Sequence, residues 1–337
     1  MIGRTRSLAF PILDSTGVGE ARRGAAQMAE QAGLDQSAAG KVAILVTELA
    51  GNLHKHAREG SLLLRRVSTG ELGIEILAVD KGPGMADVEK CFRDGYSTIG
   101  TPGTGLGSVV RLADRWDVYS QEKVGTVLMA QVGGMNSGHA VSRFDVGAVT
   151  LPMIKGEPCG DNWAHLWNPS RERVMVADGL GHGQYAAEAA EEAERIFRAK
   201  EGYALPDVMQ AIHNGLKKTR GAAVTLLEMD FERRIVRCVG IGNISAAILH
   251  AGATRSMVSH NGTVGHEARK IQEFQYPWPE GSLLIMNSDG LLSKWEVSKY
   301  SGLTMRHPSL TAATLWRDFS RGRDDITVIA MKERPAR

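Results

Sequence analysis

The chain has 337 residues, of which 43% are hydrophobic and 23% charged, an ordinary globular composition with enough sequence for two domains of about 150 residues. A formal net charge of +2, without any run of Lys or Arg, argues against a nucleic-acid or membrane partner. No apolar stretch reaches the ~18 residues of a spanning helix, and the basic N-terminus lacks the apolar core of a signal peptide. Three widely spaced cysteines without a CxxC pair fit neither a zinc site nor a disulfide framework. We therefore expect a reduced, soluble, cytoplasmic protein.

The first half of the chain reads as helices followed by strands. Apolar residues at helical spacing predict helices over residues 21–34 and 37–57. Strands are expected over 62–67 and 74–79, then a glycine-rich loop and a short helix from 108. Residues 116–119 and 127–132 read as a β-hairpin around Gly125. This order predicts a helix-plus-sheet sandwich instead of an alternating βαβ fold.

A small, flexible segment at residues 133–138 separates the two halves, so we expect domains at 1–134 and 139–337. Helices are predicted in the second half over 186–200, 206–218 and 310–319. Strands are predicted over 145–151, 174–177, 223–229, 235–239, 246–249, 283–286 and 326–331. Many strands with two central helices indicate an α+β sandwich.

Three segments of the first half together suggest a nucleotide site. On the second helix, Glu48, Asn52 and His56 are four residues apart and share one face. The strand at 74–79 ends in Asp80-Lys81-Gly82-Pro83-Gly84, which can present a carboxylate while the backbone comes close to a planar base. Gly103-Thr104-Gly105-Leu106-Gly107 opens a helix, where backbone N–H groups can approach phosphates. Each segment alone is common as a solvated face or a turn, and only their order favours a nucleotide site.

The three segments resemble the N, G1 and G2 boxes of the GHKL (Bergerat) ATPases, and the anti-sigma-factor serine kinases in particular, over about residues 5–132. The resemblance implies an α/β sandwich that binds ATP, with a lid near 95–98. Asn52 would hold the Mg²⁺ ion, Asp80 would accept from the adenine amino group, and Glu48 would be the base that activates a protein serine. The pocket and the lid would be shaped by Gly82, Gly84, Gly103, Thr104, Gly105, Leu106 and Gly107.

One departure from this family leaves two interpretations open. Gly51 stands before Asn52, where the switch kinases of this family carry an arginine. The domain is therefore either a protein serine kinase or a non-catalytic module that senses ATP or binds a sigma factor. No helix with a phospho-acceptor histidine precedes it, which disfavours a histidine kinase.

The second half carries four acidic spots, each expected at a turn beside a strand: Asp161, Asp178-Gly179, Asp289-Gly290 and Asp324-Asp325. Asp-Gly pairs are common turn residues, so one or two such spots would mean little. Four in this order are hard to attribute to chance. Oxygen ligands without a Cys or His set favour Mg²⁺ or Mn²⁺, and two such ions can activate a water for attack on phosphorus.

The acidic spots resemble the SpoIIE-like branch of the metal-dependent (PPM-type) protein phosphatases over about residues 140–333. The resemblance implies an αββα β-sandwich. Asp178 would bridge two metals at the catalytic centre, with the Gly179 carbonyl as a further ligand. Asp161, Asp289 and Asp324 would complete the metal shells, while Asp325 would support the turn.

Three residues near the acidic spots in the sequence suggest other roles. His182 could act as a general acid, although the Gly-His-Gly run also reads as backbone geometry. Cys159 does not make a cysteine phosphatase, because the C-x5-R phosphate cradle is missing and residue 165 is His. Asn243 follows a strand and is expected to be structural.

Together these patterns predict a bifunctional signalling switch. Its phosphatase half would act on a phosphorylated STAS-domain protein, either an anti-sigma antagonist or a stressosome component, using Mg²⁺ or Mn²⁺. Its ATP-binding half would carry serine kinase activity, or alternatively would only sense ATP or bind a sigma factor and regulate the phosphatase. A homodimer is an expectation from the resemblance. A purely scaffolding protein is disfavoured, since four convergent carboxylates without a metal would only repel one another.

Overall fold

The computed structural model describes residues 6–68, 72–92, 105–134 and 142–335. The chain forms two compact units: unit 1 comprises Met1–Val141 and Lys299–Arg317, and unit 2 comprises Ser142–Ser298 and Asp318–Arg337. The boundary expected at 135–138 lies outside the described residues, so the domain limits 1–134 and 139–337 stay a prediction. The inclusion of Lys299–Arg317 in unit 1 was not anticipated from the sequence.

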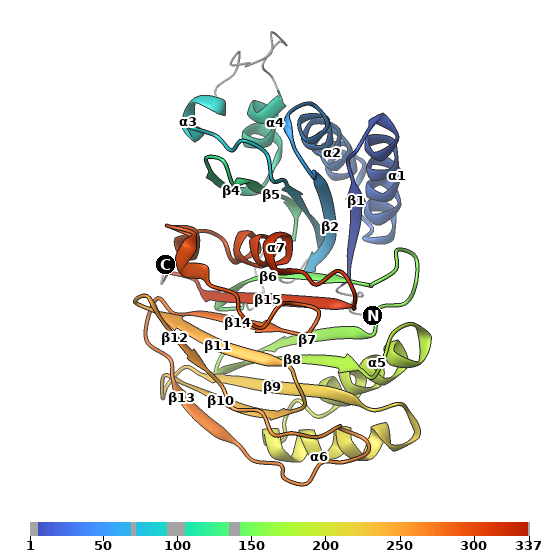
Figure 1. The fold of residues 1–337 in the computed structure, drawn as a ribbon, viewed down its shortest axis with the longest axis vertical. Helices are drawn as coiled ribbons and strands as arrows, with labels where there is room; N and C mark the ends of the chain where they lie inside the picture. The colour runs from blue at the N-terminus through green and yellow to red at the C-terminus, as the bar shows by residue number, and fades with distance from the viewer. Residues whose placement is uncertain (1–5, 69–71, 93–104, 135–141, 336–337) are drawn as a thin grey trace. The chain divides into compact units, whose positions relative to one another are not determined.

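Unit 1 is built on an antiparallel sheet with the strand order β1-β2-β3-β5-β4 (Figure 1). Its strands are β1 (Ser7–Pro11), β2 (Ser61–Ser68), β3 (Leu72–Val79), β4 (Arg115–Gln121) and β5 (Gly125–Gly133). Its helices are α1 (Ser15–Gln31), α2 (Gln36–His56), α3 (Val88–Cys91) and α4 (Gly105–Leu112). The helix-plus-sheet sandwich expected for this half is confirmed, and β1, too short to show a pattern, is an additional strand.

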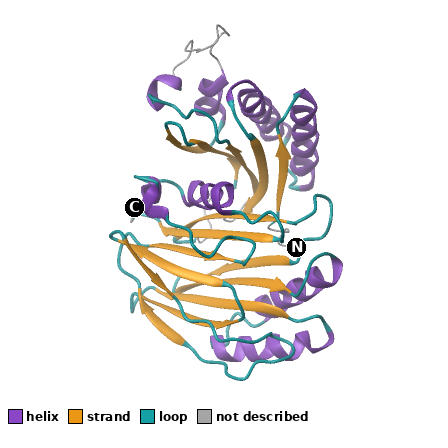
Figure 2. Ribbon diagram, viewed as in Figure 1, coloured by secondary structure: helices purple, strands orange, loops and turns teal. Residues whose placement is uncertain are grey.

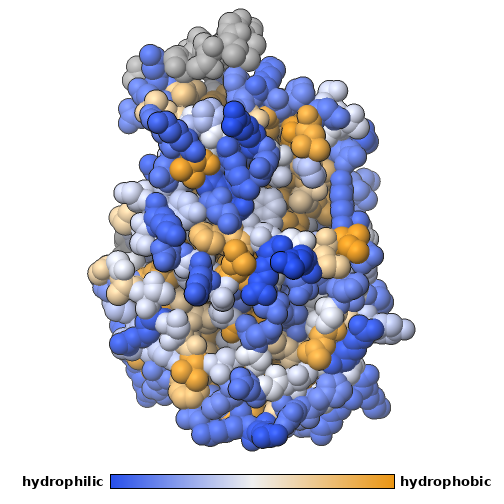
Figure 3. Space-filling model, in the orientation of Figure 1, coloured by the Kyte–Doolittle hydropathy of each residue, from blue (hydrophilic) through white to orange (hydrophobic). Residues whose placement is uncertain are grey.

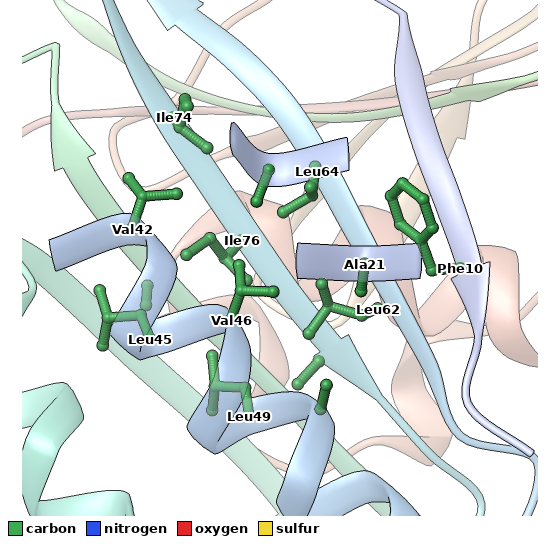
Figure 4. Close-up of a cluster of buried hydrophobic side chains, with 14 of the residues drawn as sticks. Phe10, Ala21, Val42, Leu45, Val46, Leu49, Leu62, Leu64, Ile74 and Ile76 are labelled. Atoms are coloured by element: carbon green, nitrogen blue, oxygen red, sulfur yellow. The ribbon is translucent and has the colours of Figure 1, made fainter. Parts of the chain in front are cut away.

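Helices α1 and α2 bury their apolar faces against the sheet. Each begins at an aspartate whose side chain accepts backbone N–H bonds, Asp14 for α1 and Asp35 for α2. Figure 4 shows the resulting core, in which side chains of α2 meet those of β2 and β3. Its largest members include Phe10, Val42, Leu45, Val46, Leu49, Leu62, Leu64, Ile74 and Ile76. Because side chains alternate along a strand, Glu75 between Ile74 and Ile76 lies on the opposite face of the sheet.

The opposite face of this sheet is contacted by the second segment of unit 1. This segment contains the short 3₁₀ helix Leu303–Met305 and most of α7 (Pro308–Phe319). Ser309 of α7 donates to the Glu75 carboxylate, and Tyr300 packs edge-on against Tyr119 of β4. Unit 1 is therefore a sheet with helices on both faces.

Unit 2 contains two five-stranded antiparallel sheets. The first has the order β13-β10-β9-β8-β7, with β7 (Asp161–Trp167), β8 (Arg171–Gly179), β9 (Ala222–Asp230), β10 (Ile235–Ile241) and β13 (Phe274–Pro277). The second has the order β12-β11-β14-β15-β6, with β6 (Phe144–Leu151), β11 (Ser245–His250), β12 (Ala253–Ser256), β14 (Leu283–Asn287) and β15 (Ile326–Glu333).

The two sheets of unit 2 face each other across one hydrophobic core to which both contribute, for example Val174, Val176 and Leu227 from one and Leu284, Met286 and Ile329 from the other. Helices α5 (Gln184–Ala199) and α6 (Leu205–Gly215) cover the outer face of the first sheet, as Figure 2 shows. The expected α+β sandwich is thus confirmed. Strands β7, β12 and β13 were not predicted, because polar residues within β7 and the shortness of β12 and β13 hide the alternation.

Within the described ranges, no helix is both long and apolar enough to cross a membrane. The face of the molecule in Figure 3 is mostly hydrophilic, with hydrophobic side chains scattered in small groups. Scattered exposed apolar residues of this kind are normal for a globular surface.

Candidate functional site

Two of the acidic residues are direct neighbours across a strand pair. Asp161 is the first residue of β7, and Asp178 lies next to the end of β8; the register pairs them opposite each other. Their Cβ atoms are therefore within roughly 5.5 Å. The sequence placed both acids in turns, whereas both belong to strands, so the ladder holds them side by side.

The other two acids come from the second sheet. Asp289 follows β14 by two residues and Asp324 precedes β15 by two, and these strands are hydrogen-bonded neighbours. Ser288 joins this pair to the first sheet, since its hydroxyl donates to Asp161 Oδ2 at 2.6 Å. The same hydroxyl accepts from the Thr327 backbone N–H at 2.9 Å. Ser288 is fully buried, and this role had no signal in the sequence.

Asp325 acts as a structural brace beside the acids. It is buried, and its carboxylate accepts from the backbone N–H groups of Met153 at 2.7 Å and Gly160 at 2.6 Å. A side chain at Gly160 would collide with this carboxylate, and one at Gly290 would lie 2.0 Å from the Asp325 carbonyl oxygen. Asp325 thus fixes the loops that precede Asp161 and follow Asp289, in agreement with the supporting role expected for it.

Gly179 is required by the close approach of α5. A Cβ atom on Gly179 would lie 2.1 Å from the carbonyl oxygen of Ala186 in the first turn of that helix. The Gly179 N–H donates to the Gly160 carbonyl at 3.0 Å. The glycine therefore lets the chain turn from Asp178 into α5 while staying bonded to the strand that carries Asp161.

Little positive charge lies near these carboxyl groups, and the pKa values of three of them are raised. Burial and the charges of Asp161, Asp289, Asp324 and Asp325 raise the pKa of Asp178 to about 9. Burial likewise raises the pKa of Asp161 to about 7, against a lowering by the Ser288 hydrogen bond. The pKa of Asp289 is raised by burial and by Asp324, while Arg321 lowers it. Four carboxylates in such a place need a counter-charge to be ionised together.

Two of the acids accept hydrogen bonds from nearby residues. Asp289 Oδ2 accepts from the Asn243 side-chain amide at 2.7 Å, and Asp324 Oδ1 accepts from the Asp325 N–H. Asp161 Oδ1 is the exception, being buried without a hydrogen-bond partner. Among the residues that the structure describes, no three acidic, His or Cys side chains converge closely enough to form a ready metal shell.

The residues present fit a divalent cation. A buried carboxylate oxygen without a donor is costly unless a proton or a cation satisfies it. The donors at this place are carboxylate and backbone oxygens, which Mg²⁺ and Mn²⁺ prefer, and neither His nor thiolate joins them. Asp161, Asp178, Asp289 and Asp324, with the Gly179 carbonyl, are therefore the set that could hold the metal.

The loop beyond Gly179 presents exposed side chains beside the acids. His182 is exposed, with Nδ1 4.0 Å from Glu157 Oε2, and is part of a loop whose neighbours Gly181 and Gly183 have positive φ. Tyr185 is 62% exposed, and the guanidinium of Arg220 lies over its ring at 5.0 Å. Cys159 is buried. Tyr185 at the start of α5 and Arg220 before β9 thus form an exposed aromatic and cationic pair near this loop, and in the described chain His182 has no contact that marks it as a general acid.

In unit 1, the residues expected to bind nucleotide extend along α2. Glu48 and Asn52 are half-buried and one helical turn apart, and in the described part of the chain neither side chain makes a hydrogen bond. His56, at the next position of this stripe, is exposed at the end of the helix. α2 also packs beside α4, the helix that begins at Gly105.

Asp80 follows β3 directly and is held by local hydrogen bonds. Its Oδ1 accepts from the Gly82 N–H at 2.6 Å, which leaves Oδ2 for another donor. Burial raises its pKa, against the lowering by these backbone hydrogen bonds. Gly84 has φ +74°, and a Cβ there would lie 2.3 Å from the Gln121 carbonyl oxygen, so only glycine fits this turn.

Part of the predicted nucleotide site lies outside the described residues, namely Gly103, Thr104 and the lid-like segment 95–98. Gly105, Leu106 and Gly107 form the first turn of α4. The structure therefore places Glu48 and Asn52 on a helix that contacts α4, with Asp80 directly after a strand of the sheet that α2 covers.

Comparisons with known proteins match the two halves separately. A family model described as histidine kinase-like ATPase domain matches residues 13–132, and one described as stage II sporulation protein E (SpoIIE) matches residues 168–334. The serine/threonine-protein kinase RsbT of Bacillus subtilis is 33% identical over 111 residues, which cover 33% of this chain and 84% of RsbT. The phosphoserine phosphatase RsbX of the same organism is 29% identical over 138 residues, 40% of this chain and 67% of RsbX.

Solved structures resemble the chain over more than half its length. A chain from work on the bacterial stressosome as a modular system for secondary messenger signalling has 26% identity and a TM-score of 0.52, covering 57% of this chain and 100% of that one. RsbX in complex with magnesium has 20% identity and a TM-score of 0.50, covering 59% of this chain and 98% of that one. At this identity the RsbX structure supports the sandwich fold alone.

Proposed function

Because the chain belongs to two families at once, joining a histidine kinase-like ATPase domain to a SpoIIE-type (PPM) protein serine/threonine phosphatase domain, we propose that it resets a phosphorylation switch. Unit 2 would remove phosphate from a serine or threonine of a STAS-domain protein, an anti-sigma antagonist or a stressosome component. The name of RsbX as a phosphoserine phosphatase and the stressosome origin of a similar structure support this substrate class.

The observation that carries the phosphatase proposal is the Asp161–Asp178 pair. A buried carboxyl, Asp161, and a half-buried one, Asp178, are held opposite each other on neighbouring strands, and one oxygen of Asp161 has no hydrogen-bond partner among the described residues. A purely structural role would not place like charges there. Asp161, Asp178, Asp289, Asp324 and the Gly179 carbonyl would hold Mg²⁺ or Mn²⁺, and the metal would supply a water nucleophile at neutral pH.

This chain's own residues would then position and recognise the substrate. Ser288 and Asn243 hold Asp161 and Asp289 in fixed orientations. Tyr185 and Arg220 form an exposed rim in which an aromatic ring and a guanidinium can contact a phosphoprotein.

The test is hydrolysis of a phosphoserine-bearing STAS protein and of p-nitrophenyl phosphate, each with and without Mn²⁺ or Mg²⁺. Asp178→Asn and Asp289→Asn would run beside the wild type, and Asp207→Asn, an exposed acid on α6, is the matched control. Metal-dependent activity that disappears only in the first two variants supports the proposal. A protein that neither binds Mn²⁺ in calorimetry nor hydrolyses either substrate contradicts it.

For unit 1 we propose ATP binding through Asn52, Asp80 and the glycines Gly82, Gly84, Gly103, Gly105 and Gly107, with Thr104 and Leu106. Asn52 would hold the Mg²⁺ ion that accompanies the nucleotide. Glu48, one turn before Asn52, would act as the base toward a protein serine. The half-buried position of both residues and their lack of partners in the described chain support a role toward a ligand.

A second candidate for unit 1 is a non-catalytic sensor of ATP, or a sigma-factor binding module. Gly51 in place of the kinase arginine favours this alternative. Transfer of labelled phosphate from ATP to a STAS protein separates the two, with Glu48→Ala as the test and Glu30→Ala, an exposed acid on α1, as its control. Transfer that depends on Glu48 establishes the kinase; binding without transfer establishes the sensor. We place the protein in the cytoplasm, where ATP and such partners are found, and sedimentation would test for a homodimer.

A further inference from the structure

The segment Lys299–Arg317, hereafter the bridging segment, belongs to unit 1 although its chain neighbours on both sides belong to unit 2. In the sequence it lies inside residues 168–334, which match the SpoIIE family. A part of the phosphatase sequence is therefore packed into the nucleotide-binding unit.

A buried ion pair anchors the bridging segment to the sheet of unit 1. Glu75 on β3 is 1% exposed, and its Oε1 accepts from the Arg65 guanidinium at 3.1 and 2.8 Å. Its other oxygen, Oε2, accepts from the Ser309 hydroxyl of α7 at 2.5 Å. A buried carboxylate must have its remaining lone pairs satisfied, so this bond fixes where α7 lies on the sheet.

A second anchor lies where the segment enters α7. The His307 backbone N–H donates to Asp117 Oδ2 on β4 at 2.8 Å, and Arg306 Nη1 lies 3.3 Å from Asp117 Oδ1. Together with Ser309, these contacts attach α7 to two strands of the sheet. The bridging segment is thus held by charged and polar contacts of defined geometry and not only by apolar packing.

The far end of the same segment reaches the predicted adenine loop. Arg317 Nη1 donates to the backbone carbonyl oxygen of Asp80 at 3.0 Å. The positive charge of Arg317 is also close enough to the Asp80 carboxyl to lower its pKa, opposing the effect of burial. An arginine from the phosphatase sequence therefore contacts the residue expected to recognise adenine.

Directly after Arg317, the chain is bonded to the loop that carries Asp289. The Phe319 carbonyl accepts from the Leu292 N–H at 2.8 Å, and the Arg321 N–H donates to the Gly290 carbonyl at 2.9 Å. The predicted ligand Asp324 follows three residues after Arg321. Phe319 follows Arg317 by only two residues. A displacement of Arg317 would therefore shift the backbone beside the proposed metal ligands Asp289 and Asp324.

We propose that Arg317 is a positioning residue for the Asp80 loop, and that through it nucleotide binding in unit 1 and phosphatase activity in unit 2 are coupled. The inference rests on the proposed function, since both sites must bind their ligands. A nucleotide that favours one position of the Asp80 loop favours one position of Arg317, and thereby one arrangement of the loops at Asp289 and Asp324. Coupling between binding sites is reciprocal, so metal at the acids would change nucleotide affinity by the same factor.

The experiment uses the full chain and two measurements. The first is the dissociation constant of the non-hydrolysable ATP analogue AMP-PNP with Mg²⁺, by calorimetry. The second is the rate of p-nitrophenyl phosphate hydrolysis in excess Mn²⁺, with and without AMP-PNP. Asp80→Asn, which should lose adenine recognition, supplies the baseline for any removal of Mn²⁺ by the nucleotide itself.

Arg317→Met removes the donor while keeping much of the side-chain length, and Arg317→Lys keeps a charged donor. In the wild type we expect AMP-PNP to change the rate by about 5-fold or more relative to the baseline. In Arg317→Met the ratio of the hydrolysis rates with and without AMP-PNP, corrected for the baseline, should approach one, and nucleotide binding should weaken several-fold. Arg317→Lys should recover part of both effects. Arg23→Met, an exposed arginine on α1, is the matched control and should behave as the wild type.

Three results would overturn the inference. One is a wild-type rate ratio equal to the Asp80→Asn baseline despite nucleotide binding, which leaves the proposed ATP binding intact. Another is an Arg317→Met protein with unchanged nucleotide affinity and rate ratio. The third is a wild type that does not bind nucleotide at all, which removes the proposed function of unit 1 as well. Should Arg317→Met fail to fold, Ser309→Ala, which loses the bond to Glu75, is measured in its place, and an unchanged ratio there is equally contrary.

Discussion

The two candidate sites differ in how they are assembled. The acids of unit 2 come from four strands or strand ends of two sheets and are joined by bonds between residues far apart in sequence, such as Ser288 with Asp161. The nucleotide residues of unit 1 lie on one helix and one strand end, with mostly local bonds such as Gly82 with Asp80.

The two candidate sites also differ in their electrostatics. Asp161 is buried and Asp178 half-buried among like charges, and their pKa values are raised to about 7 and about 9. Glu48 and Asn52 are half-buried, with no hydrogen-bond partner in the described chain. In the proposed metal site a cation would relieve the repulsion between carboxylates, whereas the proposed nucleotide site is a set of open polar groups that would suit reversible binding of a ligand.

The largest expected effect comes from Asp178→Asn. Loss of a hydrogen-bonded neighbour of a ligand usually costs 10–100-fold, so loss of a ligand itself should reduce metal-dependent phosphatase activity by roughly 100-fold or more. Asp178, with its pKa raised to about 9, must take up a proton on folding at neutral pH and Asn need not, so the metal-free variant should melt at a higher temperature than the metal-free wild type. Scanning calorimetry and the p-nitrophenyl phosphate assay measure the two effects. A variant less stable than the wild type without metal would argue against stored repulsion.

A smaller effect is expected from Ser288→Ala. The change leaves Asp161 without its hydroxyl donor and the Thr327 N–H without its acceptor, and should weaken Mn²⁺ binding by about 10–100-fold. Calorimetric titration with Mn²⁺ is the measurement. Ser170→Ala, whose hydroxyl bonds only to Asn168 in an exposed turn, is the control and should bind Mn²⁺ normally. Equal affinities for the two variants would mean that the link between the sheets does not orient Asp161.

In unit 1 the corresponding test is Gly84→Ala. It combines a positive φ with a Cβ that would lie 2.3 Å from the Gln121 carbonyl oxygen, so we expect a cost of about 1–3 kcal/mol and weaker nucleotide binding. Gly33→Ala has a similar φ, +66°, but no atom within 4 Å of the added Cβ. It should be less destabilised and should bind nucleotide as the wild type does. Denaturant unfolding and nucleotide titration would show whether the close approach, and not φ alone, matters.

A further effect, which accumulates over several pH units, is a pH dependence of stability without metal. The folded-state pKa values of Asp161 and Asp178 lie above the ~4 of an unfolded aspartate, so the stability present below about pH 4 is lost as the pH rises toward 7 and 9. The wild type should lose stability relative to Asp178→Asn by at most about 1.4 kcal/mol per pH unit. Denaturant unfolding between pH 5 and 8, first with a chelator and then with Mn²⁺, measures the free energy of unfolding at each pH. Parallel pH profiles of the two proteins without metal would contradict it.

Much of the architecture could be predicted from local patterns. The helical spacing of Val42, Leu45, Val46 and Leu49 places α2, and the hairpin around Gly125 joins β4 to β5 as expected. Strand β7 was missed, because Asp161-Asn162 and His165 interrupt its apolar alternation. Without β7 the acid at its start could only be assigned to a turn.

The candidate site was predictable as a list of residue types but not as an arrangement. Strand ends, glycines and acids are visible in a sequence because they act through local backbone geometry. Three contacts are not visible in this way: the pairing of Asp161 with Asp178, the hydrogen bond of Ser288 between the sheets, and the hydrogen bond from Arg317 to Asp80. Each depends on which strand neighbours which, and on how the chain returns from one unit to the other.

The sequence by itself determined the two families of motif, the oxygen-only chemistry of the acids and the periods of the main helices and strands, because these are encoded within a few residues. Only the tertiary structure decided that Lys299–Arg317 belongs to unit 1, and that a serine and an arginine with no motif of their own contact residues of the two proposed sites. Such contacts join residues more than 100 positions apart, and their free energy depends on burial and register that exist only once the sheets have formed.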